Sequence, residues 1–285
     1  KNLQNTSAGK VQVTNKSVIS TAGTGSAGLI AQSVGGGGGV VSISSTEKII
    51  LGATGVVNAI GSDVNVKNSG DISSSGTASS LIVAQSIGGG GGFTTLDDDE
   101  TNLNQSNTIQ LGSKQAVLAK SSSVTIENSG NLYSTGSASS AIVAQSVGGG
   151  GGNIGKLSLD PFESDLHLGS KNSRTGFSGS VTIKNEGSFI KTEGDYSRAI
   201  LAQSIGGGGG WVAGFTEESS NVMLGAKSPS SSIDSGDILL INKANITTSG
   251  LSAGGITAQS IGGGGGLIGN RSGQIQMGLS DGSGS

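Results

Sequence analysis

The chain contains no cysteine, a single histidine and only 3% aromatic residues among its 285 positions. Without cysteine it can form neither a disulfide framework nor a thiolate metal site. One lone histidine gives no zinc site and no His-based catalytic triad with a repeated partner. Charged residues are also scarce, at 12%, about half the share of an ordinary globular domain. Such a composition cannot build a thick core of large side chains.

Two further absences limit the partners. The net charge is −3 and no cluster of Lys and Arg occurs, so we expect no nucleic-acid partner. No run approaches 18 apolar residues, so we expect no helical membrane insertion by this segment. The opening residues, KNLQNTSAGK, lack the apolar stretch of a signal peptide and begin part-way into a repeat. We therefore expect a piece of a longer protein.

What the chain has in abundance is glycine, 54 residues in all, much of it in one repeated motif. The nonapeptide AQS(V/I)GGGGG occurs five times, with its glutamine at Gln32, Gln85, Gln145, Gln203 and Gln259. These glutamines are 53, 60, 58 and 56 residues apart. Self-similarity at a nearly fixed period is typical of a solenoid or array.

Two other segments recur in each copy. An upstream segment such as VNVKNSG or VTIENSG places an asparagine 17 or 18 residues before the glutamine, at Asn15, Asn68, Asn128, Asn185 and Asn242. A downstream fragment such as IILGA or IQLGS begins at Ile49, Ile109, Leu166, Val222 and Ile275. We interpret residues 1–285 as a single repeat domain. It contains repeats 40–92, 93–152, 153–210 and 211–266, with partial repeats at 1–39 and 267–285.

The repeated segments have the pattern of β-strands. They alternate apolar and polar residues with period two and are rich in β-branched side chains, and no useful stretch has a helical stripe. The sequence therefore predicts an all-β parallel β-helix. A repeat of about 57 residues would hold four or five strands and, we expect, two rungs, with three as the alternative. About ten rungs at about 4.8 Å each would make a rod about 50 Å long.

The strand before each glycine run carries apolar residues of both parities. Ile82 lies three residues before Gln85 and Ile87 two residues after it, so a regular strand would point them to opposite faces. Either a bulge intervenes or both faces are buried. The glycine runs begin at Gly35, Gly88, Gly148, Gly206 and Gly262. We expect an ordered tract that turns a corner or forms a flat layer, and the alternative is a flexible loop between rungs.

The repeated glutamines also have more than one interpretation. With two rungs per repeat they would lie about 9.6 Å apart, too far to form an amide ladder. We therefore expect each amide to satisfy backbone groups where the strand gives way to glycine. A ligand-binding role is the alternative.

On these motifs, from about Val11 to Gly266, the chain resembles passenger regions of Gram-negative autotransporters and related giant surface proteins. These carry AQSIGGGGG repeats and upstream segments like NSGNLYSTG. The resemblance implies a right-handed parallel β-helix, secretion through the outer membrane and display at the cell surface. It further implies roles in adhesion, biofilm or matrix. It carries over no catalytic residue.

Candidate contact residues fall in the variable stretches after the glycines, because loops on a rigid scaffold commonly hold binding specificity. They are Phe93, Asp97, Asp98, Asp99, Phe162, Trp211 and Phe215. The acidic cluster LDDDE suits calcium, but it occurs in one copy only and a solvated loop is the preferred interpretation. We expect no cofactor and no metal.

Three functions remain open. The first is a structural and adhesive surface segment that contacts host or neighbouring cells, or extracellular matrix polysaccharide. The second is a self-associating module that forms fibres through glycine stripes or open terminal rungs. The least favoured is a β-helix carbohydrate-active enzyme, which would need carboxylates paired across rungs.

Overall fold

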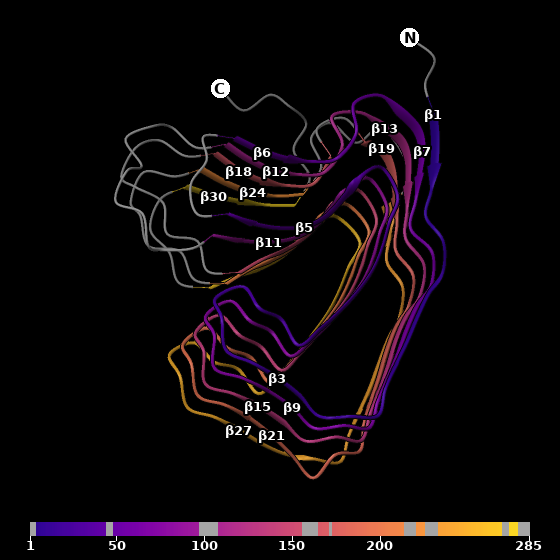
Figure 1. Cartoon of the computed structure of the whole chain (residues 1–285). Coiled ribbons are helices and arrows are strands. Elements are labelled where there is room, and N and C mark those ends of the chain that lie inside the picture. The colour runs from indigo at the N-terminus through magenta and orange to yellow at the C-terminus, as the bar shows by residue number, and fades with distance from the viewer. Residues whose placement is uncertain are drawn as a thin grey trace.

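The computed structural model describes residues 4–43, 48–96, 108–155, 165–170, 173–213, 221–225, 233–269 and 274–278. Within these ranges all regular structure is β-strand, and the strands form six parallel sheets of five. Each sheet takes every sixth strand, so each turn of the chain passes through all six sheets once (Figure 1). This confirms the all-β parallel β-helix expected from the sequence.

Three sheets, named A, B and C, are built from the first half of each turn. Sheet A contains β1 (Gln4–Ser7), β7 (Val56–Ile60), β13 (Ala116–Lys120), β19 (Ser173–Phe177) and β25 (Ile233–Asp234). Sheet B contains β2 (Val11–Asn15), β8 (Val64–Asn68), β14 (Val124–Asn128), β20 (Val181–Asn185) and β26 (Ile238–Asn242). Sheet C contains β3 (Ile19–Thr21), β9 (Ile72–Ser74), β15 (Leu132–Ser134), β21 (Phe189–Thr192) and β27 (Asn245–Thr248).

The other three sheets, D, E and F, complete the turn. Sheet D contains β4 (Leu29–Val34), β10 (Ile82–Ile87), β16 (Ile142–Val147), β22 (Ile200–Ile205) and β28 (Ile256–Ile261). Sheet E contains β5 (Gly38–Ile43), β11 (Gly91–Leu96), β17 (Gly151–Ile154), β23 (Gly209–Val212) and β29 (Gly265–Ile268). Sheet F contains β6 (Lys48–Leu51), β12 (Thr108–Leu111), β18 (Asp165–Leu168), β24 (Asn221–Leu224) and β30 (Gln274–Met277).

The expected count of two rungs per repeat is wrong. Equivalent residues of successive repeats pair directly, as Gln85 does with both Gln32 and Gln145. Each repeat therefore makes one rung of six strands, and the described chain makes five rungs. At about 4.8 Å per step the stack rises about 19 Å from the first rung to the last, less than half the length expected.

Sheets B, C and D enclose the first of two compartments. Strands such as β8 and β14 alternate inward apolar and outward polar residues, and the inward Val64 and Val66 are 0% and 1% exposed. They pack in one apolar cluster with Ile72 of sheet C and Ile82 of sheet D. This compartment is filled by small and medium aliphatic residues, as the composition requires.

The second compartment is layered, because the chain folds back after the glycine run. Sheet E packs across the second face of sheet D, where Phe93 and Trp211 meet Val83, Val143 and Leu201. The opposite face of sheet E, with Ile154 and Val212, packs on the leucines and isoleucines of sheet F. Sheet E is thus the middle of three layers. This inward fold is why one rung consumes a whole repeat.

The strand before the glycines carries apolar residues of both parities, which the sequence explained either by a bulge or by burial of both faces. Burial of both faces is correct. β10 pairs with β16 in unbroken register from Ile82 to Ile87, without a bulge. Every residue of β10 is buried. Sheet D is therefore a shared wall, with Ile82 on the side of sheets B and C and Val83 on the side of sheet E.

Candidate functional site: amide ladders and a charged groove

The five glutamines stack on one another as an amide ladder, which contradicts the expectation that they lie too far apart to bond. The Nε2 atom of Gln85 donates to Oε1 of Gln145 at 2.6 Å. The next two steps, from Gln145 to Gln203 and from Gln203 to Gln259, measure 2.7 and 2.8 Å. Gln32 donates to Gln85 in the same way. The ladder forms because one rung per repeat brings equivalent residues to adjacent strands.

The same glutamines also bind the backbone of the glycine strand, as the sequence suggested. Nε2 of Gln145 lies 3.3 Å from the carbonyl oxygen of Gly152, and Nε2 of Gln203 lies 3.3 Å from that of Gly210. The side chains of Gln85, Gln145 and Gln203 are 0% exposed. Their amides tie each rung to the next and sheet D to sheet E, which makes them parts of the interior scaffold.

The repeated asparagines form a second ladder at the end of sheet B. Nδ2 of Asn68 donates to Oδ1 of Asn128 at 2.7 Å. Asn15 donates to Asn68, and Asn128 donates to Asn185, at the same distance. In Asn15, Asn68, Asn128 and Asn242 the Nδ2 atom also caps the turn that follows, as Asn68 does with the carbonyl oxygen of Gly70 at 2.7 Å. The fourth step, from Asn185 to Asn242, measures 2.6 Å. The inserted residue after Asn185 leaves the ladder intact because it lies beyond the paired strand.

In rungs 1, 3 and 4 the serine of the AQS motif is bonded to the backbone of two rungs. Oγ of Ser146 donates to the carbonyl oxygen of Ser122 at 2.8 Å and accepts from the amide of Gly179 at 2.8 Å. Ser204 makes the corresponding bonds with Gly179 and Gly236. These hydroxyls are committed to joining rungs and lie beside no histidine. They give no indication of nucleophilic catalysis.

The glycine runs are ordered, as we expected, and pack within their own coil. Gly148 to Gly152 are all buried, and four of the five have positive φ, from +84° to +136°. A Cβ atom added at Gly151 would overlap the carbonyl oxygen of Gly209 in the next rung. Glycine is required here both for its backbone conformation and for the close approach of two rungs. The runs turn the corner from sheet D and begin sheet E.

The expectation that Phe93 and Trp211 lie in contact loops is wrong, because both are core residues that are 1% exposed. Each directly follows a glycine run and so occupies the third residue of a sheet E strand, facing sheet D. Their variability between copies reflects packing of one interior column. The remaining candidates, Asp97, Asp98, Asp99, Phe162 and Phe215, lie outside the described residues.

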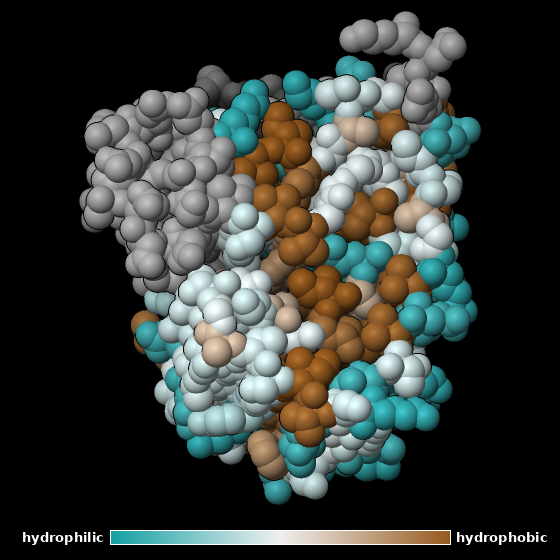
Figure 2. Space-filling model, viewed as in Figure 1, coloured by the Kyte–Doolittle hydropathy of each residue, from teal (hydrophilic) through white to brown (hydrophobic). Residues whose placement is uncertain are grey.

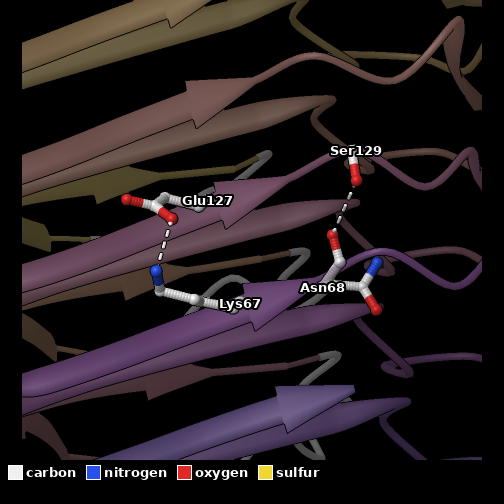
Figure 3. Close-up of polar contacts among 4 residues, drawn as sticks. All are labelled: Lys67, Asn68, Glu127 and Ser129. Atoms are coloured by element: carbon white, nitrogen blue, oxygen red, sulfur yellow. Dashed lines mark hydrogen bonds and ion pairs between the residues drawn. The ribbon is translucent and has the colours of Figure 1, made fainter. Parts of the chain in front are cut away.

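A groove lined by polar and charged side chains runs across rungs 1 to 4, beside the asparagine ladder. It encloses about 520 Å³. Its lining consists only of polar and charged residues, namely Thr14, Asn15, Lys16, Lys67, Asn68, Ser69, Glu127, Asn128, Ser129, Lys184 and Glu186. Figure 3 shows its centre, where Lys67 and Glu127 project together from neighbouring strands β8 and β14 while Ser129 reaches back toward Asn68.

Ion pairs neutralise part of this groove. Nζ of Lys67 lies 3.1 Å from the Glu127 carboxylate, and Nζ of Lys243 lies 2.6 Å from that of Glu186. The hydrogen bond from Lys243 lowers the pKa of Glu186, and the charges of Lys243 and Lys184 act in the same direction. A carboxyl group with a lowered pKa remains ionised and is a poor general acid.

The sequence interpretation missed this groove. Its charged residues lie one position before or after the repeated asparagine. They are outward-facing because the asparagine itself faces inward. With one rung per repeat, these charged positions align in columns across neighbouring strands. This alignment is the signal in the sequence that predicts the groove.

Other chemistry is limited in the described residues. No three His, Cys, Asp or Glu side chains there could together hold a metal ion, and no helix there is long and apolar enough to cross a membrane. The single histidine, His167, is 7% exposed, and its Nε2 lies 3.0 Å from the carbonyl oxygen of Gly225. The histidine is thus a buried part of sheet F.

Comparison with known proteins adds no relative to this picture. No family model, no curated protein and no solved structure matches the chain. The ladders, the glycine layer and the charged groove are therefore the features that bear on function.

Proposed function

We propose that this chain is a structural and adhesive segment of a bacterial surface or secreted protein, of the autotransporter passenger type. Its role is to hold outer faces at fixed positions for contact with host cells, neighbouring cells or matrix polysaccharide. The Gram-negative surface location follows from the resemblance of the repeated nonapeptide and its upstream segment. We propose no catalytic activity and no cofactor.

The observation that carries this proposal is the continuity of the two amide ladders through all five rungs. The repeated interior columns of glutamine, asparagine and glycine fix the stack, whereas the outward positions differ from rung to rung without disturbing it. Buried, fully bonded amides are costly to leave unpaired and so enforce a single register. A scaffold of fixed register with a variable outer surface suits repeated contact better than turnover.

The two carboxylates of the groove also favour binding. Glu127 and Glu186 are each paired with a lysine, whereas an inverting or retaining glycosidase needs one carboxyl group with a raised pKa. The unpaired lysines nearby add charge but no proton acceptor. The arrangement can hold a ligand and has no evident acid–base pair.

An attachment assay tests the proposal. Beads coated with the purified chain are allowed to settle on surfaces bearing bacterial extracellular polysaccharide or cell matrix, and are compared with albumin-coated beads under flow. We expect retention above the albumin control, unchanged by a chelator and without release of reducing sugar ends. Equal detachment of both bead types, or steady release of reducing ends, would count against an adhesive scaffold.

Self-association is a second candidate function, and the exposed apolar residues favour it. Figure 2 shows an apolar band with polar margins on the face turned to the viewer. A separate group of outward-facing large apolar side chains lies on rung 5 and consists of Leu239, Ile241 and Leu251. Clusters of this kind commonly mark protein contacts.

Sedimentation velocity over a range of concentrations tests this second candidate. We expect the weight-average mass to rise with concentration, and Leu239→Ser together with Ile241→Ser to reduce the rise. Val18→Ser, at a 73% exposed residue of rung 1, is the matched control. A monomer at every concentration contradicts self-association.

A further inference from the structure

We propose that the groove across sheet B binds a carboxylated oligosaccharide, with the acidic groups of the ligand on Lys16 and Lys184. This inference rests on the proposed adhesive function and specifies the ligand class for one surface. The groove is a polar cavity of about 520 Å³ to which successive repeated strands contribute matching positions.

The strands beneath the groove exclude a peptide that binds by strand addition. β8, β14 and β20 each pair with a neighbour on both edges, so they offer no free edge to an extended peptide. The lining also contains no aromatic or large aliphatic side chain, and peptide grooves normally supply apolar pockets for anchor residues. The ligand must instead present hydroxyl groups and charge.

The charge balance of the groove selects an anion. Lys67 is paired with Glu127, and Glu186 is paired with Lys243 from the last rung. After each glutamate has taken one lysine, the ammonium groups of Lys16 and Lys184 remain as excess positive charge. The chain as a whole has a net charge of −3, so this groove is locally opposite in sign to the rest of the protein.

The spacing of these two lysines selects a chain-like anion. Lys16 belongs to rung 1 and Lys184 to rung 4. Three inter-rung steps separate them by about 14 Å along the axis. A single carboxylate cannot reach both, whereas an extended run of several acidic sugar units can.

The groups between the two lysines suit sugar hydroxyls. Lys67 supplies donors and Glu127 supplies acceptors on adjacent strands (Figure 3). Oγ of Ser129 donates to the backbone oxygen of Asn68 at 3.5 Å, so its lone pairs remain available to accept. A sugar hydroxyl both donates and accepts, and this alternating lining can satisfy both roles.

Calorimetric titration of the intact chain with defined hexasaccharides tests the proposal. The probes are hexagalacturonate, which carries carboxylates, a heparin-derived sulfated hexasaccharide and neutral maltohexaose. We expect hexagalacturonate to bind at least about tenfold more tightly than maltohexaose. Raising NaCl from about 20 to about 200 mM should weaken its binding severalfold, because exposed charges are screened. Binding of the sulfated probe alone, equal binding of the neutral probe, or no binding overturns the inference.

Two matched double variants locate the site. Lys16→Gln with Lys184→Gln should weaken hexagalacturonate binding at least about tenfold without changing the urea midpoint, because both side chains are exposed. Lys10→Gln with Lys120→Gln removes the same charge from exposed positions outside the groove and should change affinity less than about twofold. An equal loss in both variants contradicts a site in this groove.

The two assays separate this inference from the function on which it rests. A chain that retains beads on matrix but does not bind hexagalacturonate refutes the groove assignment alone. A chain that binds hexagalacturonate but does not retain beads refutes the adhesive function alone.

Discussion

Replacing Gly151 by alanine tests whether the glycine layer is a required part of the fold. Gly151 is buried at the start of β17 with φ +132°, a conformation that costs an L-residue about 1–3 kcal/mol. The new methyl group would also overlap the carbonyl oxygen of Gly209 in the next rung. Sheet E must therefore open at this point.

The magnitude follows from the bonds that such an opening strains. The amide of Gly151 donates to the carbonyl oxygen of Gly90 at 3.0 Å, and that of Gly209 donates to Gly150 at 3.0 Å. Losing both adds about 1 kcal/mol each to the conformational cost. We expect the free energy of unfolding to fall by about 3–5 kcal/mol.

Urea denaturation followed by far-ultraviolet circular dichroism measures this change, and Gly263→Ala is the matched control. Gly263 lies in the glycine run of rung 5, where nothing lies within 4 Å of an added Cβ. Because φ is not positive at Gly263, alanine there should be neutral or stabilising by up to about 1 kcal/mol. A midpoint for Gly151→Ala equal to or above that of the unaltered chain would show that the glycines are spacers. Rapid amide exchange throughout residues 148–152 would show the same.

Three further substitutions probe the interior by their urea midpoints. Ile142 is 0% exposed, so Ile142→Ala should lower the free energy of unfolding by about 2–4 kcal/mol through lost burial and a cavity. Ile256 is 49% exposed, so Ile256→Ala should lower it much less. Equal losses would contradict the placement of this column in the core. Gln145→Leu removes the centre of the glutamine ladder and leaves one donor and one acceptor of its neighbours unpaired, so it should cost about 2–5 kcal/mol, and a smaller effect than that of Gln259→Leu would argue against the ladder. Asn153→Leu should stabilise by about 1–3 kcal/mol, since both polar atoms of this 0% exposed amide are without a hydrogen-bond partner; a lower midpoint would indicate a role for the amide.

The sequence by itself determined which residues are equivalent and which of them form strands. The period-two pattern of VNVKN and VTIEN predicted the strands of sheet B, because alternate side chains of a strand point to opposite faces. The mixed parity of the strand before the glycines predicted that both of its faces are buried or bulged, and sheet D is buried on both faces. The invariant length of the glycine runs correctly indicated ordered structure.

Only the tertiary structure decided how many rungs each repeat makes. Periodicity along the chain records where strands begin and end, but it does not record that sheet E folds back between sheets D and F. That inward layer lengthens each turn to a full repeat and brings Gln85 and Gln145 within hydrogen-bonding distance. It also turns Phe93 and Trp211 inward and aligns Lys67 with Glu127 outside. The glutamine contact and the Lys67–Glu127 ion pair join residues 60 positions apart, and they exist because stacking places these residues on adjacent strands.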